Sequence, residues 1–466
     1  MKLSEAIEAL ESGRFAGRGQ RVLCAVSGGA DSVALLNIMQ SASHAAGYEL
    51  LAAHVHHGIR AESDEELEFV TGLCRELGVE LFTCRADVPG LARESGESVE
   101  SAARRVRYKF FYRVACEQGC DLIALAHHSR DQAETVLMHA LRGASVSGLC
   151  GMRPCAGMLI RPLLDVEPEE LREYLGAHGI GFREDATNSD TRYTRNFVRH
   201  VILPDCEQAY PGSRAGLCRL ARAAQRDDDF INSMADAAAR ESLFDYPGGF
   251  YLDAERMRGL HDAIGARIAA RAMRLCGQDA QEAGVECILA ALNGKGAGAG
   301  GNLPGDVRVS RGARRVYLEL PDPGRGSHRA GTMDECVAVH ADRLPARAEC
   351  SLGALEMNAL ELCPGARLGD GIWEQTVDAA ALCGAELRFR RAGDTIWPLG
   401  APGEKKLKDF YIGKKVDRQI RGYLPVLARG SKVLWALGVG VSRDCAIGAD
   451  TRSAVHLIWQ GKRFWQ

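Results

Sequence analysis

Residues 21–36 constrain the fold of this chain more than any other segment. Their sequence, RVLCAVSGGADSVALL, is an apolar run, a Gly-rich turn and a segment with apolar residues at helical spacing, which predicts a strand, a tight loop and a helix. Gly28 and Gly29 have no Cβ, so the loop backbone can adopt positive φ and approach a ligand closely. The loop N–H groups and the N-terminus of the following helix then form a cradle for an anion such as phosphate.

Asp31 is the unexpected residue in this loop, because a carboxylate beside a bound phosphate is repelled unless a cation lies between them. The loop therefore predicts Mg²⁺ at Asp31 and nucleotide chemistry. It is not a Walker loop, since no Lys-Ser/Thr follows the glycines, and it is not a dinucleotide fingerprint, since GxGxxG is absent. A plain glycine turn with a capping Asp is the alternative interpretation.

Strand and helix signals alternate through the first two hundred residues. Strands are predicted at 49–56, 79–85 and 121–127, and helices at 62–77, 98–118 and 130–141. This pattern predicts an α/β fold with a doubly wound parallel sheet covered on both faces. Ligands in such sheets bind beyond the carboxyl ends of the strands, so the Ser27 loop and residues 54–60 and 127–131 are expected to meet in one crevice. Ser129 and Gln132 have the spacing of a capping box at the start of the last helix.

The remaining chain is expected to form further parts. We assign residues 1–205 to the nucleotide domain, 206–320 to a mainly helical middle domain that becomes mixed toward its end, and 385–466 to a small α+β domain. A Pro/Gly-rich segment beginning at Pro321 predicts a linker, and residues 331–384 stay unassigned. In the last domain, strands are predicted around ELRFRR and KVLWALGVGV, with a basic helix at KKLKDFYIGKK between them.

Length, charge and cysteine usage restrict the class of protein. A chain of 466 residues is too long for one ordinary core, so about two to four domains are expected. The net charge is −3, yet residues 386–432 hold 12 Lys and Arg against 5 Asp and Glu, which suits either a nucleic-acid surface or a basic solvated face. None of the 16 cysteines forms a CxxC pair, and no apolar run approaches the roughly 18 residues of a membrane span. We therefore expect a cytoplasmic protein with no membrane partner.

Six segments resemble one known family. SGGxDS after a strand is the pyrophosphate-loop (PP-loop) motif of the N-type ATP pyrophosphatases. The other segments narrow the resemblance to the tRNA(Ile)-lysidine synthases: HVHHGIR (54–60), AHHSRDQAETVLMHALRG (126–143), RPLL (161–164), REDATNSDTRYTRNFVRHVILP (183–204), and GDTIWPLG with KKLKDFYIGKKV (393–416). The resemblance is dense over about 20–205 and 387–440.

This resemblance implies an ATP-dependent modification of the wobble cytidine of the CAU-anticodon isoleucine tRNA. The cytidine carbonyl is adenylated, and the side-chain amine of free L-lysine then displaces AMP to give lysidine. Expelling pyrophosphate requires hydrogen-bond donors and Mg²⁺ to take its charge. The residues assigned to ATP and pyrophosphate are Ser27, Gly28, Gly29, Ala30, Asp31, Ser32, His57, Arg105 and His127, with Asp31 holding Mg²⁺.

The lysine amine must be neutral when it attacks, although its free pKa is about 10.4. A carboxylate beside the amine can orient it and accept its proton. Asp131 and Glu134 are three residues apart on a predicted helix, so they share one face. We assign this pair to the lysine site and, with Asp31, to catalysis; two solvated helix acids are the alternative.

Basic residues supply candidate contacts to RNA phosphates. The assigned residues are Arg195, Asn196, Arg199, Lys405, Lys406, Lys408, Lys414 and Lys415. For the first three, a solvated basic helix start is the alternative. For Arg105 and Tyr108, two interpretations stay open: they contact nucleotide or tRNA, or they are ordinary surface residues of a helix.

Several features leave alternatives open. His54, His56, His57, His127 and His128 suggest zinc, but no Cys or carboxylate completes a ligand set at metal-site spacing, so hydrogen-bonding roles are preferred. The family usually has Asn at position 56 and a second Asp at position 130, where this chain has His and Arg. The rival functions are a PP-loop tRNA thiolase and a non-catalytic tRNA-binding relative. The oligomeric state is open, with a homodimer as one option.

Overall fold

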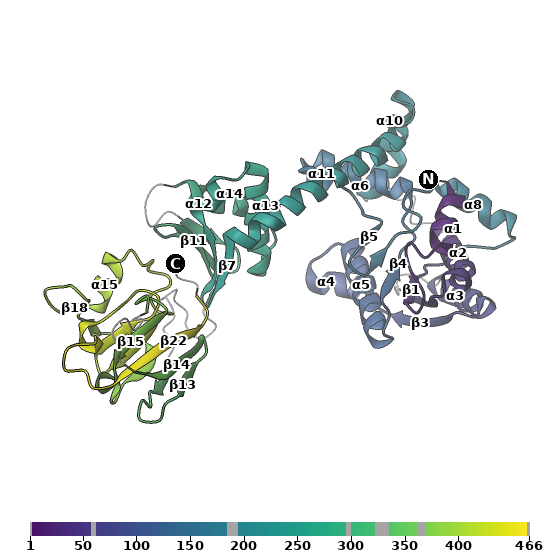
Figure 1. Cartoon of the computed structure of the whole chain (residues 1–466). Coiled ribbons are helices and arrows are strands. Elements are labelled where there is room, and N and C mark those ends of the chain that lie inside the picture. Colours follow the sequence, from purple (N-terminus) through teal and green to yellow (C-terminus); the bar gives the residue numbers. More distant parts are fainter. Residues whose placement is uncertain are drawn as a thin grey trace. The chain divides into compact units, whose positions relative to one another are not determined.

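The computed structural model describes residues 2–56, 62–183, 194–294, 300–321, 335–361 and 369–463. The chain divides into two compact units, Met1–Phe230 and Ile231–Gln466 (Figure 1). The boundary falls inside α11 (Ser213–Ser242), a helix of 30 residues. Among the helices of the described ranges, none has the length and apolar character that a membrane span requires.

The first unit is built on a six-stranded sheet in the order β3-β2-β1-β4-β6-β5. Its strands are β1 Arg21–Ala25, β2 Glu49–His56, β3 Glu80–Arg85, β4 Leu122–Ala124, β5 Cys155–Ala156 and β6 Leu159–Ile160. All neighbours are parallel except β5 and β6. The predicted doubly wound α/β fold is confirmed. The fourth strand is shorter than predicted, because after Ala124 the chain keeps one bond to β6, from Leu125 N–H to the Ile160 carbonyl, and then turns away.

Alternate residues of β1 explain why helices cover both faces of this sheet. Val22 and Cys24 pack in one core with residues of α1, α2, α3 and α8, whereas Leu23 packs in a second core with residues of α5. Burying a leucine such as Leu23 completely contributes about 2 kcal/mol. The helices of this unit before α11 are α1 Leu3–Glu11, α2 Ala30–Ala46, α3 Glu62–Leu77, α4 Val88–Ser95, α5 Val99–Glu117, α6 Ser129–Leu141, α7 Val146–Leu149, α8 Pro168–Ala177, α9 Thr194–Phe197 and α10 Leu203–Ala209.

The start of α6 differs from the prediction. The predicted capping box at Ser129 and Gln132 is wrong, because Ser129 is already the first helical residue. His128 is the N-cap instead, with extended backbone, and its imidazole accepts the Asp131 N–H while the Asp131 carboxylate accepts the His128 N–H. The cap therefore places His128 and Asp131 against each other at the end of β4.

The second unit begins with a five-stranded antiparallel sheet in the order β7-β8-β11-β10-β9. Ile268, Ala272 and Ile288 of its helices pack on Leu252 and Val316 of its strands. The elements are β7 Leu243–Tyr246, β8 Gly249–Asp253, α12 Ala254–Arg258, α13 Asp262–Leu275, α14 Glu282–Asn293, β9 Gly300–Leu303, β10 Val307–Arg311 and β11 Arg315–Glu319. The middle of the chain is thus helical up to residue 242 and mixed beyond it.

The end of the chain forms two sheets, β12-β16-β19-β20-β17-β18 with β21 beside β20, and β13-β14-β22-β15. Tyr246 and Tyr317 of the middle sheet share one core with Trp435 and Leu457 of this end of the chain. The elements are β12 Cys336–Ala338, β13 Ala346–Cys350, β14 Gly353–Leu360, β15 Glu374–Asp378, β16 Glu386–Phe389, β17 Thr395–Ile396, β18 Lys405–Lys406, α15 Leu407–Gly413, β19 Pro425–Arg429, β20 Lys432–Ala436, β21 Gly440–Val441 and β22 Ala454–Gly461. The strands and helix predicted near 386, 405 and 432 are confirmed, and the linker predicted from Pro321 lies almost wholly outside the described residues.

Candidate active site

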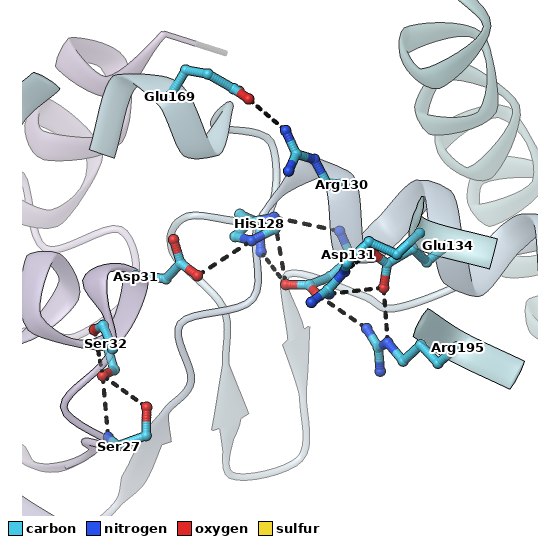
Figure 2. Close-up of polar contacts among 11 residues, drawn as sticks. Ser27, Asp31, Ser32, His128, Arg130, Asp131, Glu134, Glu169 and Arg195 are labelled. Atoms are coloured by element: carbon cyan, nitrogen blue, oxygen red, sulfur yellow. Dashed lines mark hydrogen bonds and ion pairs between the residues drawn. The ribbon is translucent and has the colours of Figure 1, made fainter. Parts of the chain in front are cut away.

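The loop between β1 and α2 has the conformation that its glycines allow. Gly28 has φ +91°, in the region that side-chain-bearing residues rarely adopt, and Gly29 is the N-cap of α2 without a side-chain cap. The hydroxyls of Ser27 and Ser32 lie 3.1 Å apart (Figure 2). Ser32 also donates to the Gly29 carbonyl at 2.9 Å. Ala30 and Asp31 form the first turn of α2. The loop therefore holds two hydroxyls beside a helix N-terminus, which favours an anion.

His128 connects this loop to α6. Its Nε2 lies 3.4 Å from Asp31 Oδ2, and its Nδ1 lies 3.5 Å from Asp131 Oδ2, so the imidazole stands between two carboxylates (Figure 2). Burial opposes the charged form of the ring, but the hydrogen bond to Asp31 and the charges of both carboxylates outweigh it and raise the pKa of His128. The sequence pattern identified His128 only as one of five neighbouring histidines. Its contact with both carboxylates could not be predicted, because Asp31 and Asp131 lie on different helices.

Two arginines neutralise the predicted acid pair. Arg195 Nε lies 2.8 Å from Glu134 Oε2, and Arg195 Nη2 lies 3.1 Å from Asp131 Oδ1. Arg199 donates its Nε to Glu134 Oε1 at 2.5 Å and its Nη2 to Asp131 Oδ1 at 3.0 Å. Arg199 belongs to a π-helical turn, Val198–Ile202, that follows α9, and half-buried Asn196 lies between the arginines in sequence. The structure thus brings the predicted lysine-binding acids and the predicted phosphate-binding arginines into one cluster.

Neighbouring charges shift the pKa values of Asp131 and Arg199 in this cluster. Burial alone would raise the pKa of Asp131, but His128 and Arg195, with His127 and Arg199, outweigh burial and lower it. Burial likewise opposes the charge of Arg199, but its bonds to Glu134 raise the Arg199 pKa. The Glu134 side chain is completely buried, and both of its carboxylate oxygens pair with guanidiniums.

Arg130 does not enter the cluster, although it precedes Asp131 directly. Its guanidinium pairs with Glu169 in the first turn of α8, away from Glu134 and Arg195 (Figure 2). The positive charge of Arg130, where the resemblance led us to expect Asp, is therefore neutralised by a residue of a different helix.

A cavity of about 890 Å³ opens beside the loop. Ser27, Gly29, Ala30, Asp31, Ser32, His54 and His127 line it. Loop residues and strand-end histidines therefore meet in one crevice, as predicted from the strand ends. Burial lowers the pKa of His127 to about 4, so this ring is neutral at pH 7. His57 lies outside the described residues.

The helix α5 contributes residues that differ in part from those predicted. Arg104, Arg107 and Tyr108 line the cavity, whereas Arg105 pairs with Glu97 at 3.2 Å on the surface. Arg104 also stacks on the Tyr108 ring at 4.8 Å. Helical spacing gave a usable signal here, because residues 104, 107, 108 and 111 lie on one face of the helix and residue 105 does not.

His54 and His56 make polar contacts with other residues of the first unit. Within the described ranges, no group of three or more His, Cys, Asp or Glu side chains could hold a metal ion. His54 bonds the Val26 carbonyl through Nδ1 at 2.9 Å, and His56 Nε2 lies 3.3 Å from Asp64 Oδ1. The preference for hydrogen-bonding roles fits these contacts.

The second unit contains a basic cleft of about 600 Å³ between the β9–β10 edge and the segment after α15. Its charged lining residues are Arg308, Arg311, Lys415, Asp417, Arg418 and Arg421. Asp417 is buried and accepts the Ala313 N–H and the Tyr317 hydroxyl. Lys405, Lys406, Lys408 and Lys414 are exposed on β18, on α15 and at its end, so Lys415 is the predicted lysine that lines the cleft.

The parallel sheet and the loop after β1 place the first unit among the PP-loop domains. The family model of the PP-loop domain matches residues 3–206, and that of the TilS substrate C-terminal domain matches residues 385–459. The tRNA(Ile)-lysidine synthase of Geobacter sulfurreducens is 32% identical over 463 residues, covering 96% of this chain and 94% of that protein. That of Clostridium perfringens (strain ATCC 13124) is 29% identical over 465 residues, covering 98% and 99%.

The chain belongs to the tRNA(Ile)-lysidine synthase family. Among solved structures, the U34-tRNA thiolase NcsA of Methanococcus maripaludis with its [4Fe-4S] cluster is similar over 48% of this chain and 78% of that chain. Its TM-score is 0.41 and its identity 20%, too low to bear on function.

Proposed function

We propose that this protein joins L-lysine to C2 of the wobble cytidine of the CAU-anticodon isoleucine tRNA, using ATP. The observation that carries the proposal is the single constellation in which the Ser27–Ser32 loop, His128 and the Asp131–Glu134 acid pair adjoin. Membership of the family supports it. The PP-loop supplies the phosphate site and the acid pair supplies the amine site.

The first step uses the loop. The cytidine O2 attacks the α-phosphorus of ATP, the new O–P bond forms, and the bond to pyrophosphate breaks. The hydroxyls of Ser27 and Ser32, the backbone at Gly28 and Gly29, and the N-terminus of α2 stabilise the charge that develops on the leaving pyrophosphate. Arg104 and Arg107 line the same cavity and add positive charge to it.

Asp31 fits a Mg²⁺ role. Its side chain is 39% exposed at the loop, and Mg²⁺ commonly takes one or two carboxylates together with substrate phosphates and water. When bound there, Mg²⁺ would neutralise phosphate charge during the first step. The hydrogen bond from His128 orients the Asp31 carboxylate.

The second step uses the acid pair. The lysine amine attacks C2, the C2–O2 bond breaks, and AMP leaves with the oxygen. The guanidiniums of Arg195 and Arg199 pair with these acids, which supports a role of the acid pair in holding a cationic amine. We propose that the lysine amine replaces the guanidinium of Arg195 or Arg199 at the acid pair, and that the displaced arginine then pairs with a phosphate of ATP or tRNA. Asp131 orients the amine and accepts its proton.

The second unit is proposed to bind tRNA. The cleft lined by Arg308, Arg311, Lys415, Arg418 and Arg421 has five cations around one carboxylate, which suits a phosphate backbone. We keep residues 1–205 as the catalytic part, 206–320 as the middle part and 385–466 as the tRNA-binding part. A cytoplasmic location and a homodimer remain predictions, and light scattering of the purified chain tests the second.

The two rival functions have less support. Within the described ranges, no cysteine lines the cavity at the loop, whereas a thiolase usually uses cysteines for catalysis or for a cluster. A non-catalytic relative was suggested by Arg130, but its pairing with Glu169 leaves the acid pair intact.

Lysine transfer tests the proposal directly. Full-length protein is incubated with ATP, Mg²⁺, labelled lysine and a CAU-anticodon isoleucine tRNA transcript, with a transcript that carries U at the wobble position as the control. We expect ATP-dependent label on the CAU transcript alone. No transfer to it would contradict the proposal.

Two aspartate variants separate the roles. Asp31→Asn should abolish tRNA-dependent release of pyrophosphate. Asp131→Asn should preserve adenylation and pyrophosphate release while it lowers lysine transfer. Asp64→Asn, on an exposed carboxylate, is the matched control and should transfer lysine as the wild type does. Full pyrophosphate release by Asp31→Asn would rule out the role proposed for Asp31.

A further inference from the structure

His54 lies in the wall of the cavity beside the loop and has a buried ring nitrogen, Nε2, that neither the loop chemistry nor the acid pair uses. It lies on β2, is 2% exposed, and lines the cavity beside the loop. Val26 extends β1 by one residue, with its N–H bonded to the Ala53 carbonyl at 2.9 Å. This pairing brings the Val26 carbonyl to 2.9 Å from His54 Nδ1.

The contact determines which atom of the ring carries the proton. A carbonyl oxygen can accept but not donate, so Nδ1 is the N–H donor in this bond. Burial lowers the pKa of His54, so the ring holds a single proton. Nε2 therefore presents a lone pair. Within the part of the chain that the structure describes, no group is placed to donate to Nε2.

The surrounding wall suits a nucleobase. Phe182 and Arg183 line the same cavity, and the Arg183 guanidinium stacks on the Phe69 ring at 5.6 Å. Flat aromatic and guanidinium groups of this kind stack on bases. The backbone N–H of Arg183 donates to the Gly28 carbonyl at 2.9 Å, so this wall of the cavity is attached to the phosphate loop itself.

We propose that His54 Nε2 accepts a hydrogen bond from the 6-amino group of adenine and so selects ATP over 6-oxo purine nucleotides. This inference rests on the proposed use of ATP and names the residue that reads its base. A 6-oxo purine presents a carbonyl oxygen at the same position, so two acceptors would face each other and the buried nitrogen would stay unpaired.

Equilibrium binding of nucleotides to the full-length wild-type protein tests the inference without any variant. The probes are ATP, ITP, N6,N6-dimethyl-ATP and 2′-deoxy-ATP. We expect ITP and N6,N6-dimethyl-ATP to bind at least about tenfold more weakly than ATP, the effect of one hydrogen bond, and 2′-deoxy-ATP to bind like ATP. Binding of ITP or of the dimethyl analogue as tight as ATP would overturn the inference.

Two variants then assign the effect to His54. In His54→Asn the amide N–H replaces Nδ1–H toward the Val26 carbonyl, while the atom at Nε2 is lost. In His54→Gln the amide oxygen can take the place of Nε2. We expect His54→Asn to bind ATP about tenfold more weakly and to lose its preference over ITP, and His54→Gln to keep a preference for ATP. If folded His54→Asn still prefers ATP over ITP as strongly as the wild type does, the inference is overturned. It is also overturned if the substitution changes the affinity for 2′-deoxy-ATP differently from that for ATP, because His54 would then contact the sugar.

Melting temperatures of both variants accompany the binding measurements. If His54→Asn does not fold, the decision passes to folded His54→Gln and to the wild-type analogue series. Neither lysine nor tRNA is needed, so a failure of lysine transfer leaves this test decidable. Absence of any ATP binding would defeat the proposed function itself.

Discussion

Glu134→Gln is the substitution whose effect on stability the cluster specifies most closely. Glu134 is completely buried and accepts three bonds, two from Arg199 at 2.5 and 3.0 Å and one from Arg195 at 2.8 Å. Glutamine removes the charge and turns one acceptor into a donor that faces a guanidinium N–H. Breaking a buried pair costs about 3–5 kcal/mol, and the arginines are 22% and 28% exposed, so we expect a loss of about 2–3 kcal/mol.

Urea denaturation can measure this loss in one unit alone. All five tryptophans lie in the second unit, at positions 373, 397, 435, 459 and 465, so tryptophan fluorescence reports that unit. Far-UV circular dichroism reports both units. With a urea dependence of about 2–3 kcal/mol/M, Glu134→Gln should lower the midpoint of the first unit by about 1 M and leave the fluorescence midpoint unchanged.

Glu169→Gln is the matched control. It removes the same charge from an ion pair whose side chains are 32% and 59% exposed, so about 0.5 kcal/mol or less is expected. Equal losses in the two variants, or a shift of the fluorescence midpoint as large as that of the first unit, would refute the reasoning.

Three further predictions concern the loop, a histidine and the basic cleft. Gly28→Ala should weaken ATP binding at least about tenfold, because alanine at φ +91° is strained, whereas Gly72→Ala, with no atom near its added Cβ, should bind ATP normally; equal affinities would contradict this. The unfolded chain protonates His127 near pH 6.5 and the folded chain at about 4, so the stability of the first unit should fall as pH drops through this window, and His127→Gln should flatten the fall in urea midpoints; an unchanged slope argues against it. Arg418→Gln should reduce the salt dependence of tRNA binding by about one phosphate contact, and exposed Arg343→Gln should not; identical slopes would remove Arg418 from the interface.

The loop was predictable because its chemistry is local. Positive φ at Gly28, the helix N-terminus after Gly29 and the position of Asp31 all follow from six consecutive residues. The strands and helices around it were predictable for the same reason, since their apolar periodicity is contained in each segment. Boundaries were less certain: His128, rather than Ser129, caps α6, because an imidazole that can accept the Asp131 N–H starts the helix one residue earlier.

Side-chain direction on α5 shows where local reasoning ends. The family resemblance predicts that Arg105 contacts the nucleotide. Each helical residue turns about 100°, however, so Arg104 and Arg107 line the cavity and Arg105 pairs with Glu97. Which face of a helix meets the sheet depends on the packing of Phe111 and its neighbours against β1 and β4.

The sequence by itself determined the PP-loop, the parallel sheet and the sharing of one helix face by Asp131 and Glu134, because periodicity and glycine conformation act within a few residues. Only the tertiary structure decided what these groups touch. Arg195 and Arg199 reach the acid pair from more than sixty residues away, and His128, after β4, reaches Asp31, after the neighbouring strand β1. Such pairings depend on how separate elements pack, and no local pattern encodes the distance between them.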